Sequence, residues 1–317
     1  MNSKKRKIFK GVVGGVLALV IIGGGIFSYQ MGKSVGGGML EAEKEQDTYY
    51  NSVMQLQEWG YDLAKFESQY KLEEITLMAD DDQIIAGYYY IIDEDRSKDT
   101  VLLVHGMGGE AISIAPWIEM YLNEGLNVFV IDRRGTGKAK EGQLTYGWDE
   151  RKDLIACVDY LRGEIGEHKL TLHGQSLGGT VVGVYSETNH AQEHVDGFIL
   201  ECPMKSLQHM LFMVWKPDSK IMQDYAIACG SWYLKVNYGF TFKDIDLLRA
   251  QKNNNVSTLV IGCKKDELCT PQDGEKIYNQ ISAEDKQYYE LDSDHIEGYL
   301  DYPKAYTENV ISFIKNL

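Results

Sequence analysis

Residues 169–179 read Lys-Leu-Thr-Leu-His-Gly-Gln-Ser-Leu-Gly-Gly, and this stretch carries the strongest fold signal in the chain. Its first five residues predict a short strand, and the residues after Gly178 predict a helix. A tight turn between them would hold Ser176 in a strained backbone conformation with its hydroxyl projecting. Gly174 and Gly178 would keep the strand and the helix from colliding there. We therefore expect Ser176 to be a nucleophile.

Apolar runs on both sides of this turn predict a sheet that is covered on both faces. Val101–Val104, Val128–Ile131 and Thr258–Ile261 lack the alternation of half-exposed strands. Helical patterns alternate with the strands, which favours an α/β fold with a mostly parallel eight-stranded sheet whose first two strands form an antiparallel hairpin. The predicted strands are 74–78, 84–92, 100–104, 127–131, 169–172, 197–200, 258–261 and 287–291, and the predicted helices are 113–124, 148–163, 178–189, 272–281 and 303–316.

Two polar residues follow later strands at the same predicted edge of the sheet. Asp266 lies in the loop after one buried strand, and His295 lies in the loop after the last strand. Ser176, Asp266 and His295 should therefore meet as nucleophile, orienting acid and general base. Asp292 and Asp294 are rival acids by proximity, but they would need a turn to face the Nδ1 atom of His295.

The third predicted strand leads into the glycine-rich stretch His105–Gly109. Such a turn can aim a backbone N–H at a developing oxyanion, and we expect Met107 and Leu177 to supply the two N–H groups. Leu177 begins the helix after the serine, so the helix dipole also helps. His105 is an alternative base, but it lies on the oxyanion side of the sheet. We expect His105 and Gly106 to shape the loop instead.

Composition and charge exclude other classes of protein. The 317 residues are 44% hydrophobic and carry a formal net charge of −15, which opposes binding to nucleic acid. Five cysteines without Cys/His spacing argue against a disulfide framework or a zinc site. Cys263 and Cys269 are near enough to bridge in an oxidising compartment, although buried thiols are favoured. His190 and His194 lack the H-E-x-x-H pattern and are interpreted as a solvated pair. No cofactor or metal is expected.

The N-terminal segment has a different character. The first ten residues hold five basic side chains and no acid, and Lys10 is the single charge between Ile8 and Tyr29. About twenty apolar helical residues cross a bilayer core of about 30 Å. Residues 1–30 are therefore predicted to be a basic flank and a transmembrane signal anchor, with membrane contact through residues 8–29 and the remainder outside the cytoplasm. A cleaved signal peptide, and hence a secreted protein, is the alternative.

Three further regions complete the predicted organisation. Residues 31–40 are glycine-rich and predict a flexible hinge, and residues up to 70 predict an amphipathic helix. Residues 71–317 form the main domain. Within it, residues 204–250 interrupt the alternation with Met-rich and aromatic helical segments. An insertion at this edge commonly forms a lid, which we favour over plain packing on the sheet edge.

These motifs resemble the α/β-hydrolase superfamily over about residues 70–317. The resemblance rests on His105-Gly106, Asp132-Arg-Arg-Gly-Thr-Gly137, Tyr146-Gly-Trp-Asp-Glu-Arg-Lys-Asp153, Gly174-Gln-Ser-Leu-Gly-Gly179, the Asp266 loop ending at Pro271, and Asp294-His295. Within the superfamily, the chain is similar to membrane-tethered or secreted bacterial esterases. One departure is Cys263, which stands where relatives often have glycine.

The resemblance implies a serine hydrolase, most specifically a carboxylesterase that acts on a small-molecule or lipid-like ester with a small or medium acyl group. A serine peptidase or acyltransferase with the same triad is the alternative, because the superfamily includes these chemistries. A non-catalytic surface-binding protein is a third hypothesis. The complete triad and oxyanion turn argue against it.

Overall fold

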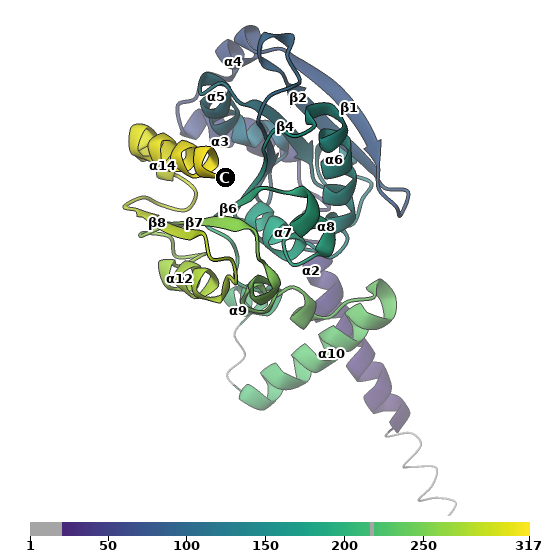
Figure 1. Cartoon of the computed structure of the whole chain (residues 1–317). Helices are drawn as coiled ribbons and strands as arrows, with labels where there is room; N and C mark the ends of the chain where they lie inside the picture. Colours follow the sequence, from purple (N-terminus) through teal and green to yellow (C-terminus); the bar gives the residue numbers. More distant parts are fainter. Residues whose placement is uncertain (1–20, 216–218) are drawn as a thin grey trace, which may run out of the picture. The chain divides into compact units, whose positions relative to one another are not determined.

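The computed structural model describes residues 21–215 and 219–317 (Figure 1). The chain divides into two compact units. Among the described residues, the smaller unit combines residues 21–39 with Trp215 and residues 219–242, and the larger, which we call the main unit, combines Leu40–Val214 with Lys243–Leu317.

The main unit is built on one sheet of eight strands, as predicted. The strands are β1 (Leu72–Met78), β2 (Ile84–Tyr90), β3 (Thr100–Val104), β4 (Asn127–Asp132), β5 (Leu170–Gln175), β6 (Gly197–Glu201), β7 (Ser257–Cys263) and β8 (Lys286–Leu291). They lie in the order β1-β2-β4-β3-β5-β6-β7-β8. The sheet is mixed: β1 and β2 form the predicted antiparallel hairpin, β2 also runs antiparallel to β4, and β3 to β8 are parallel.

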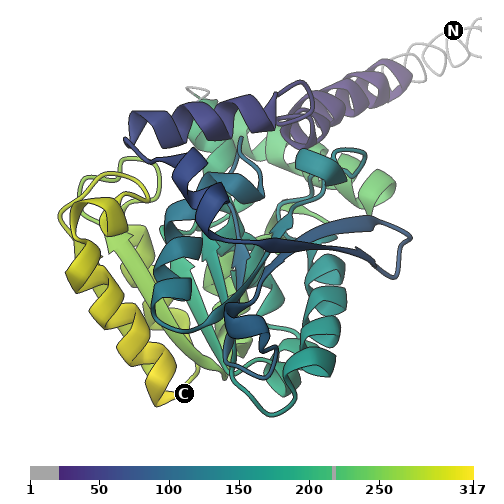
Figure 2. The same cartoon turned by 90° about the horizontal axis from the view of Figure 1, so that it is seen from above.

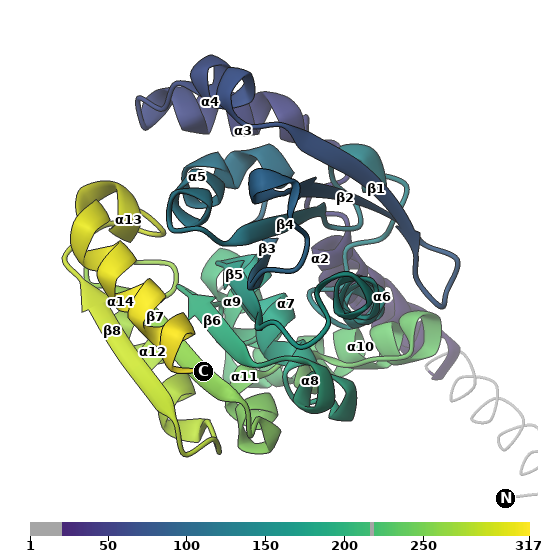
Figure 3. The same cartoon turned by 45° about the horizontal axis from the view of Figure 1, so that its top comes forward.

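Helices cover both faces of this sheet (Figure 3). The α-helices are α3 (Thr48–Glu58), α4 (Leu63–Gln69), α5 (Ala115–Asn123), α6 (Glu150–Ile165), α7 (Leu177–Tyr185), α8 (Asn189–His194), α9 (Leu207–Val214), α11 (Leu247–Ala250), α12 (Pro271–Gln280), α13 (Gly298–Asp301) and α14 (Pro303–Asn316), and the short 3₁₀ turns are η2 (Ile92–Glu94), η3 (Ala111–Ile114), η4 (Gly137–Ala139), η5 (Phe242–Asp244) and η6 (Gln251–Asn253). Helices α5 and α14 pack on one face, where Trp117, Tyr121 and Tyr306 are fully buried with Val101 and Leu103 of β3.

The segment before β1 forms two helices where the sequence predicts one. Asp47 caps α3 by accepting from the backbone N–H of Tyr50, and Asp62 caps α4 by accepting from Lys65. Gly60 lies between the helices with a φ of +69°, a backbone conformation that favours glycine and ends the first helix. The amphipathic sequence pattern therefore continues across the turn that separates the two helices.

The predicted hinge at residues 31–40 is helical in the structure. Residues 21–32 are helical, and the π-helical turn η1 (Lys33–Gly37) and α2 (Gly38–Leu40) follow. A Cβ atom on Gly32 would lie 2.5 Å from the carbonyl oxygen of Cys229, in helix α10 (Lys220–Tyr238), and one on Gly36 would lie 2.8 Å from that of Gly230. These glycines thus permit close helix packing within the smaller unit and do not mark a hinge.

Two predictions concern parts of the smaller unit. The predicted membrane segment at 8–29 lies largely outside the described residues, and no helix among residues 21–215 and 219–317 is long and apolar enough to span a bilayer. The predicted lid at 204–250 is divided, because α9 and α11 belong to the main unit and α10 belongs to the smaller one. Its action as a lid stays a prediction.

Candidate active site

Ser176 lies at the sharp turn between β5 and α7. Its φ and ψ are 53° and −115°, a strained conformation for a residue that is not glycine. The flanking glycines have no room for a side chain. A Cβ atom on Gly174 would lie 2.2 Å from the carbonyl oxygen of Gly178, and one on Gly178 would lie 2.1 Å from that of Val104. The turn therefore needs both glycines to hold the serine in this position.

The structure brings the three predicted side chains together. The Nε2 atom of His295 lies 2.9 Å from the Oγ atom of Ser176, and its Nδ1 atom lies 2.5 Å from the Oδ2 atom of Asp266. Asp266 is buried, and its Oδ1 atom accepts from the backbone N–H groups of Leu268 and Cys269, each at 2.8 Å. These bonds fix the carboxylate and leave Oδ2 to orient the imidazole.

The two rival acids lie elsewhere. Asp292 and Asp294 are exposed on the loop that carries His295. The Oδ1 atom of Asp292 lies 3.7 Å from the Nζ atom of Lys265. Because Asp266 occupies the Nδ1 side of the imidazole, neither rival is needed to orient it.

The predicted oxyanion loop runs beside the serine. A Cβ atom on Gly106 would lie 3.4 Å from the Cβ atom of Ser176, so the loop backbone approaches the nucleophile closely. Met107 follows in this loop and lines the cavity around Ser176. Leu177 is the first residue of α7, where a backbone N–H has no acceptor within the helix. Both predicted donors thus lie at the serine.

His105 supports this loop and does not face the triad. It is fully buried, and burial together with the charge of Arg133 holds its pKa well below the usual range. The neutral ring donates from Nδ1 to the carbonyl oxygen of Gly106 at 2.8 Å and accepts at Nε2 from the backbone N–H of Arg133 at 3.2 Å. His105 therefore connects the glycine-rich loop to the turn after β4.

A cavity of about 190 Å³ opens onto Ser176 and His295. Its apolar lining comes from Trp59, Met107, Ile114, Leu268 and Ile296. Gln55 and Trp59 belong to the region of α3, which sequence reasoning did not connect with the site. The Nε1 atom of Trp59 donates to Glu297 at 3.1 Å, so the end of α3 is held beside the loop of His295. Figure 2 shows α3 crossing this end of the sheet.

A buried polar network beneath the serine was also missed. Glu201, at the end of β6, is fully buried, and its Oε2 atom accepts from Gln175 at 2.7 Å, Tyr306 at 2.9 Å and His173 at 3.2 Å. The Nδ1 atom of His173 then accepts from Tyr121 at 2.9 Å. Burial, and after it the charge of Glu201, raises the pKa of Tyr121 and of Tyr306. The sequence did contain a signal for this network: Glu201 is an acid at the end of an apolar strand.

Within residues 21–215 and 219–317, two clusters have metal-ligating atoms within 4.8 Å of one another: Asp159 with His190 and His194, and Cys202 with Asp266 and His295. In the first, His190 already bonds Tyr185 at 2.7 Å and Asp159 at 3.0 Å. In the second, the carboxylate and imidazole are bonded to each other. All five cysteines are free and buried, as favoured from the sequence, and Cys263 lies in one buried cluster with Cys202 and Cys269, the residue with which it could bridge in an oxidising compartment.

Known proteins share this fold. Residues 95–225 match the family model described as Serine aminopeptidase, S33. The esterase Pf2001 of Pyrococcus furiosus has a similar structure, with a TM-score of 0.61 at 18% identity over 81% of this chain and 96% of that one. The chain therefore has the α/β-hydrolase fold. The family match includes Ser176, whereas Asp266 and His295 lie beyond it.

Two other proteins resemble this chain. The acetyl xylan esterase from Paenibacillus sp. R4 has a TM-score of 0.57 at 14% identity over 87% of this chain and 98% of that one. The uncharacterized protein YqkD of Bacillus subtilis is 21% identical over 230 residues, which are 72% of this chain and 75% of that protein. At these identities, the structural likeness establishes the fold alone.

Proposed function

We propose that this α/β-hydrolase is a serine hydrolase, most specifically a carboxylesterase that acts on small acyl esters. The observation that carries the proposal is the continuous line of hydrogen bonds from Ser176 through His295 to Asp266, at 2.9 and 2.5 Å. This arrangement is the one that activates a serine hydroxyl for attack on a carbonyl.

The proposed reaction has two stages. The Oγ atom of Ser176 attacks the ester carbonyl while Nε2 of His295 takes the hydroxyl proton, and Asp266 stabilises the resulting imidazolium. The tetrahedral oxyanion is bound by the N–H groups of Met107 and Leu177. Collapse breaks the ester bond, and His295 returns the proton to the leaving alcohol. Water, deprotonated by His295, then attacks the acyl-enzyme and releases the carboxylic acid and Ser176.

The size of the cavity favours a small acyl group. The cavity volume of about 190 Å³ is smaller than that of the pockets that enclose drug-sized ligands, which is about 300–1,000 Å³. The apolar side chains of Trp59, Ile114 and Ile296 suit a short alkyl chain, and burying each methylene contributes about 0.8 kcal/mol. Similarity to an acetyl xylan esterase and to the esterase Pf2001 adds support for an ester substrate.

A fluorophosphonate probe and a series of p-nitrophenyl esters test the proposal. We expect the probe to form a single adduct on the peptide that contains Ser176. We also expect kcat/KM to fall by about tenfold or more between butyrate and octanoate, because the longer chain exceeds the cavity. Folded protein that neither reacts with the probe nor hydrolyses any ester would contradict the proposal.

A serine peptidase is the second candidate, favoured by the description of the family model that matches residues 95–225. The same triad would cleave an amide if the cavity also bound a free amino group. Aminoacyl p-nitroanilides distinguish the two: turnover of these anilides at a kcat/KM above that of the acetate ester would favour the peptidase. An acyltransferase would instead yield a new ester when an alcohol acceptor is added.

The proposal extends to location: residues 8–29 anchor the protein in a membrane, with the main unit outside the cytoplasm. The basic flank and the apolar run support it. Ile21, Ile22, Ile26 and Phe27 lie on the described part of this run and are exposed. We expect the protein to stay with membranes after alkaline carbonate extraction and to be digested by protease added outside intact spheroplasts. A mature N-terminus near residue 30 would indicate cleavage instead.

A further inference from the structure

We propose that Glu43, far upstream of the triad, is a positioning residue that holds the oxyanion loop in its active shape. This inference rests on the proposed function, because it assigns a role in the same reaction. We call residues 40–58 the N-terminal strap. The strap lies entirely within the main unit and ends with α3.

The carboxylate of Glu43 bonds directly to the loop. Its Oε1 atom accepts from the backbone N–H of Gly108 at 2.5 Å, one residue after the predicted oxyanion donor Met107. Glu43 is 2% exposed, although nearby acids of the strap such as Glu41 and Glu45 are exposed. A carboxylate is rarely buried in this way unless its oxygens are paired.

Arg133 supplies that pairing and extends it to the other side of the loop. Its guanidinium donates to Glu43 at 2.9 and 3.2 Å, and both side chains are nearly inaccessible to solvent. The same guanidinium donates to the carbonyl oxygens of Gly106 at 2.7 Å and His105 at 3.1 Å. The pair thus holds carbonyl groups before Met107 and the N–H group after it.

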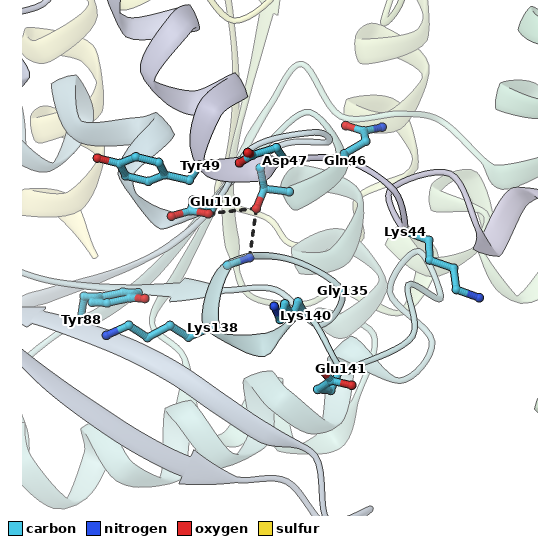
Figure 4. Close-up of a pocket in the computed structure, with 12 residues that line it drawn as sticks. Lys44, Gln46, Asp47, Tyr49, Tyr88, Glu110, Gly135, Lys138, Lys140 and Glu141 are labelled. Atoms are coloured by element: carbon cyan, nitrogen blue, oxygen red, sulfur yellow. Dashed lines mark hydrogen bonds between the residues drawn. The ribbon is translucent and has the colours of Figure 1, made fainter.

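Other strap residues fix the rest of the loop. The side chain of Asn51 donates to the carbonyl oxygen of Gly108 at 3.0 Å, and Ser52 accepts from the N–H of Glu110 at 3.0 Å. Thr48 donates to the carboxylate of Glu110 at 2.9 Å and accepts from the N–H of Gly137 at 3.2 Å. Figure 4 shows these last two bonds beside a second cavity. The strap therefore contacts the loop through side chains from successive turns.

These contacts determine which way the peptide before Met107 faces. The carbonyl oxygen of Gly106 shares this peptide with the N–H of Met107, so the two point in opposite directions. While Arg133 binds that oxygen, the N–H is directed away from Arg133. Without Glu43, the guanidinium would remain buried without its carboxylate, and the loop would rearrange or admit water.

The test uses the full chain, with Asp153→Asn as a matched control for Glu43→Gln. Asp153 is also a buried acid paired with an arginine, Arg134, at 2.8 and 2.5 Å, but none of the hydrogen bonds described for it reaches residues 105–110. The measurements are kcat and KM on p-nitrophenyl acetate, the inhibition constant of an alkyl boronic acid that mimics the tetrahedral oxyanion, and the melting temperature of each variant.

We expect Glu43→Gln to lower kcat by about 10- to 100-fold and to weaken boronate binding in parallel, with little change in KM. Asp153→Asn should lower the melting temperature while kcat stays within about threefold of the parent value. Asn51→Ala alters an exposed residue that also bonds the loop. Asn51→Ala should lower kcat by a few fold. If Glu43→Gln does not fold, Asn51→Ala replaces it as the test.

The inference would be overturned if kcat were unchanged in Glu43→Gln. If Asn51→Ala serves as the test, an unchanged kcat in that variant would have the same consequence. Equal losses of kcat in Asp153→Asn would also overturn it, because they would show a general effect of stability. Both results leave the proposed function intact if the parent protein hydrolyses the ester and reacts with the fluorophosphonate. A parent protein that does neither refutes the proposed function itself.

Discussion

Replacing any member of the triad is expected to remove nearly all ester hydrolysis. Ser176→Ala and His295→Gln should each lower kcat by about 10⁴-fold or more, and Asp266→Asn by about 10⁴-fold, because the three groups act as one proton-transfer unit. The double variant Ser176→Ala/His295→Gln should be no slower than either single one. Steady-state hydrolysis of p-nitrophenyl acetate measures these losses, and fluorophosphonate labelling should disappear in Ser176→Ala.

Asp292→Asn is the matched control for Asp266→Asn. It makes the same chemical change in the rival acid, which is exposed and is not bonded to the imidazole, so kcat should stay within about twofold of the parent value. A large loss in Asp292→Asn with little loss in Asp266→Asn would show that the orienting acid has been misassigned.

The largest expected effect on stability comes from Glu201→Ala. This change leaves the donors of His173, Gln175 and Tyr306 without their shared acceptor in a site closed to water. Each unsatisfied buried donor costs about 1–3 kcal/mol, so the free energy of unfolding should fall by about 3 kcal/mol or more. Urea unfolding followed by tryptophan fluorescence measures the change.

Two further variants serve as comparisons for Glu201→Ala. Glu201→Gln keeps the volume and one oxygen acceptor, so it should cost less than Glu201→Ala. Glu193→Ala removes an exposed acid from α8 and should change the free energy of unfolding by about 0.5 kcal/mol at most. If Glu201→Ala were as stable as Glu193→Ala, the network would contribute nothing to the fold.

The sequence predicted the parts of the site that depend on strand ends. Ser176, Asp266 and His295 each follow a strand with a recognisable apolar pattern, and parallel strands carry such residues to one edge. The antiparallel pairing of β2 with β4 was not predicted, because β2 and β4 are separated in sequence by β3 and no local pattern links them.

The strap and the network of Glu201 escaped prediction for a different reason. Glu43 stands among acids with the same local pattern, and its burial depends on Arg133, which is 90 positions away along the chain. Gly32 and Gly36 were misinterpreted as hinge residues because glycine favours both loose loops and tight helix packing. Loose loops and tight helix packing can be distinguished here only from the structure, in which Gly32 packs against the backbone of Cys229 and Gly36 against that of Gly230.

The bonds between the strap and the loop show that the domain carrying the triad begins earlier in the chain than its strands do. Boundaries drawn from the strand pattern place its start at residue 71, and the family match starts later still, at residue 95. A protein shortened to either point would keep every triad residue, yet it would lose Glu43 and also Trp59, which lines the cavity at Ser176. A shortened chain that keeps these bonds must therefore include residue 40 and everything after it, so fusions and truncations should cut before that residue.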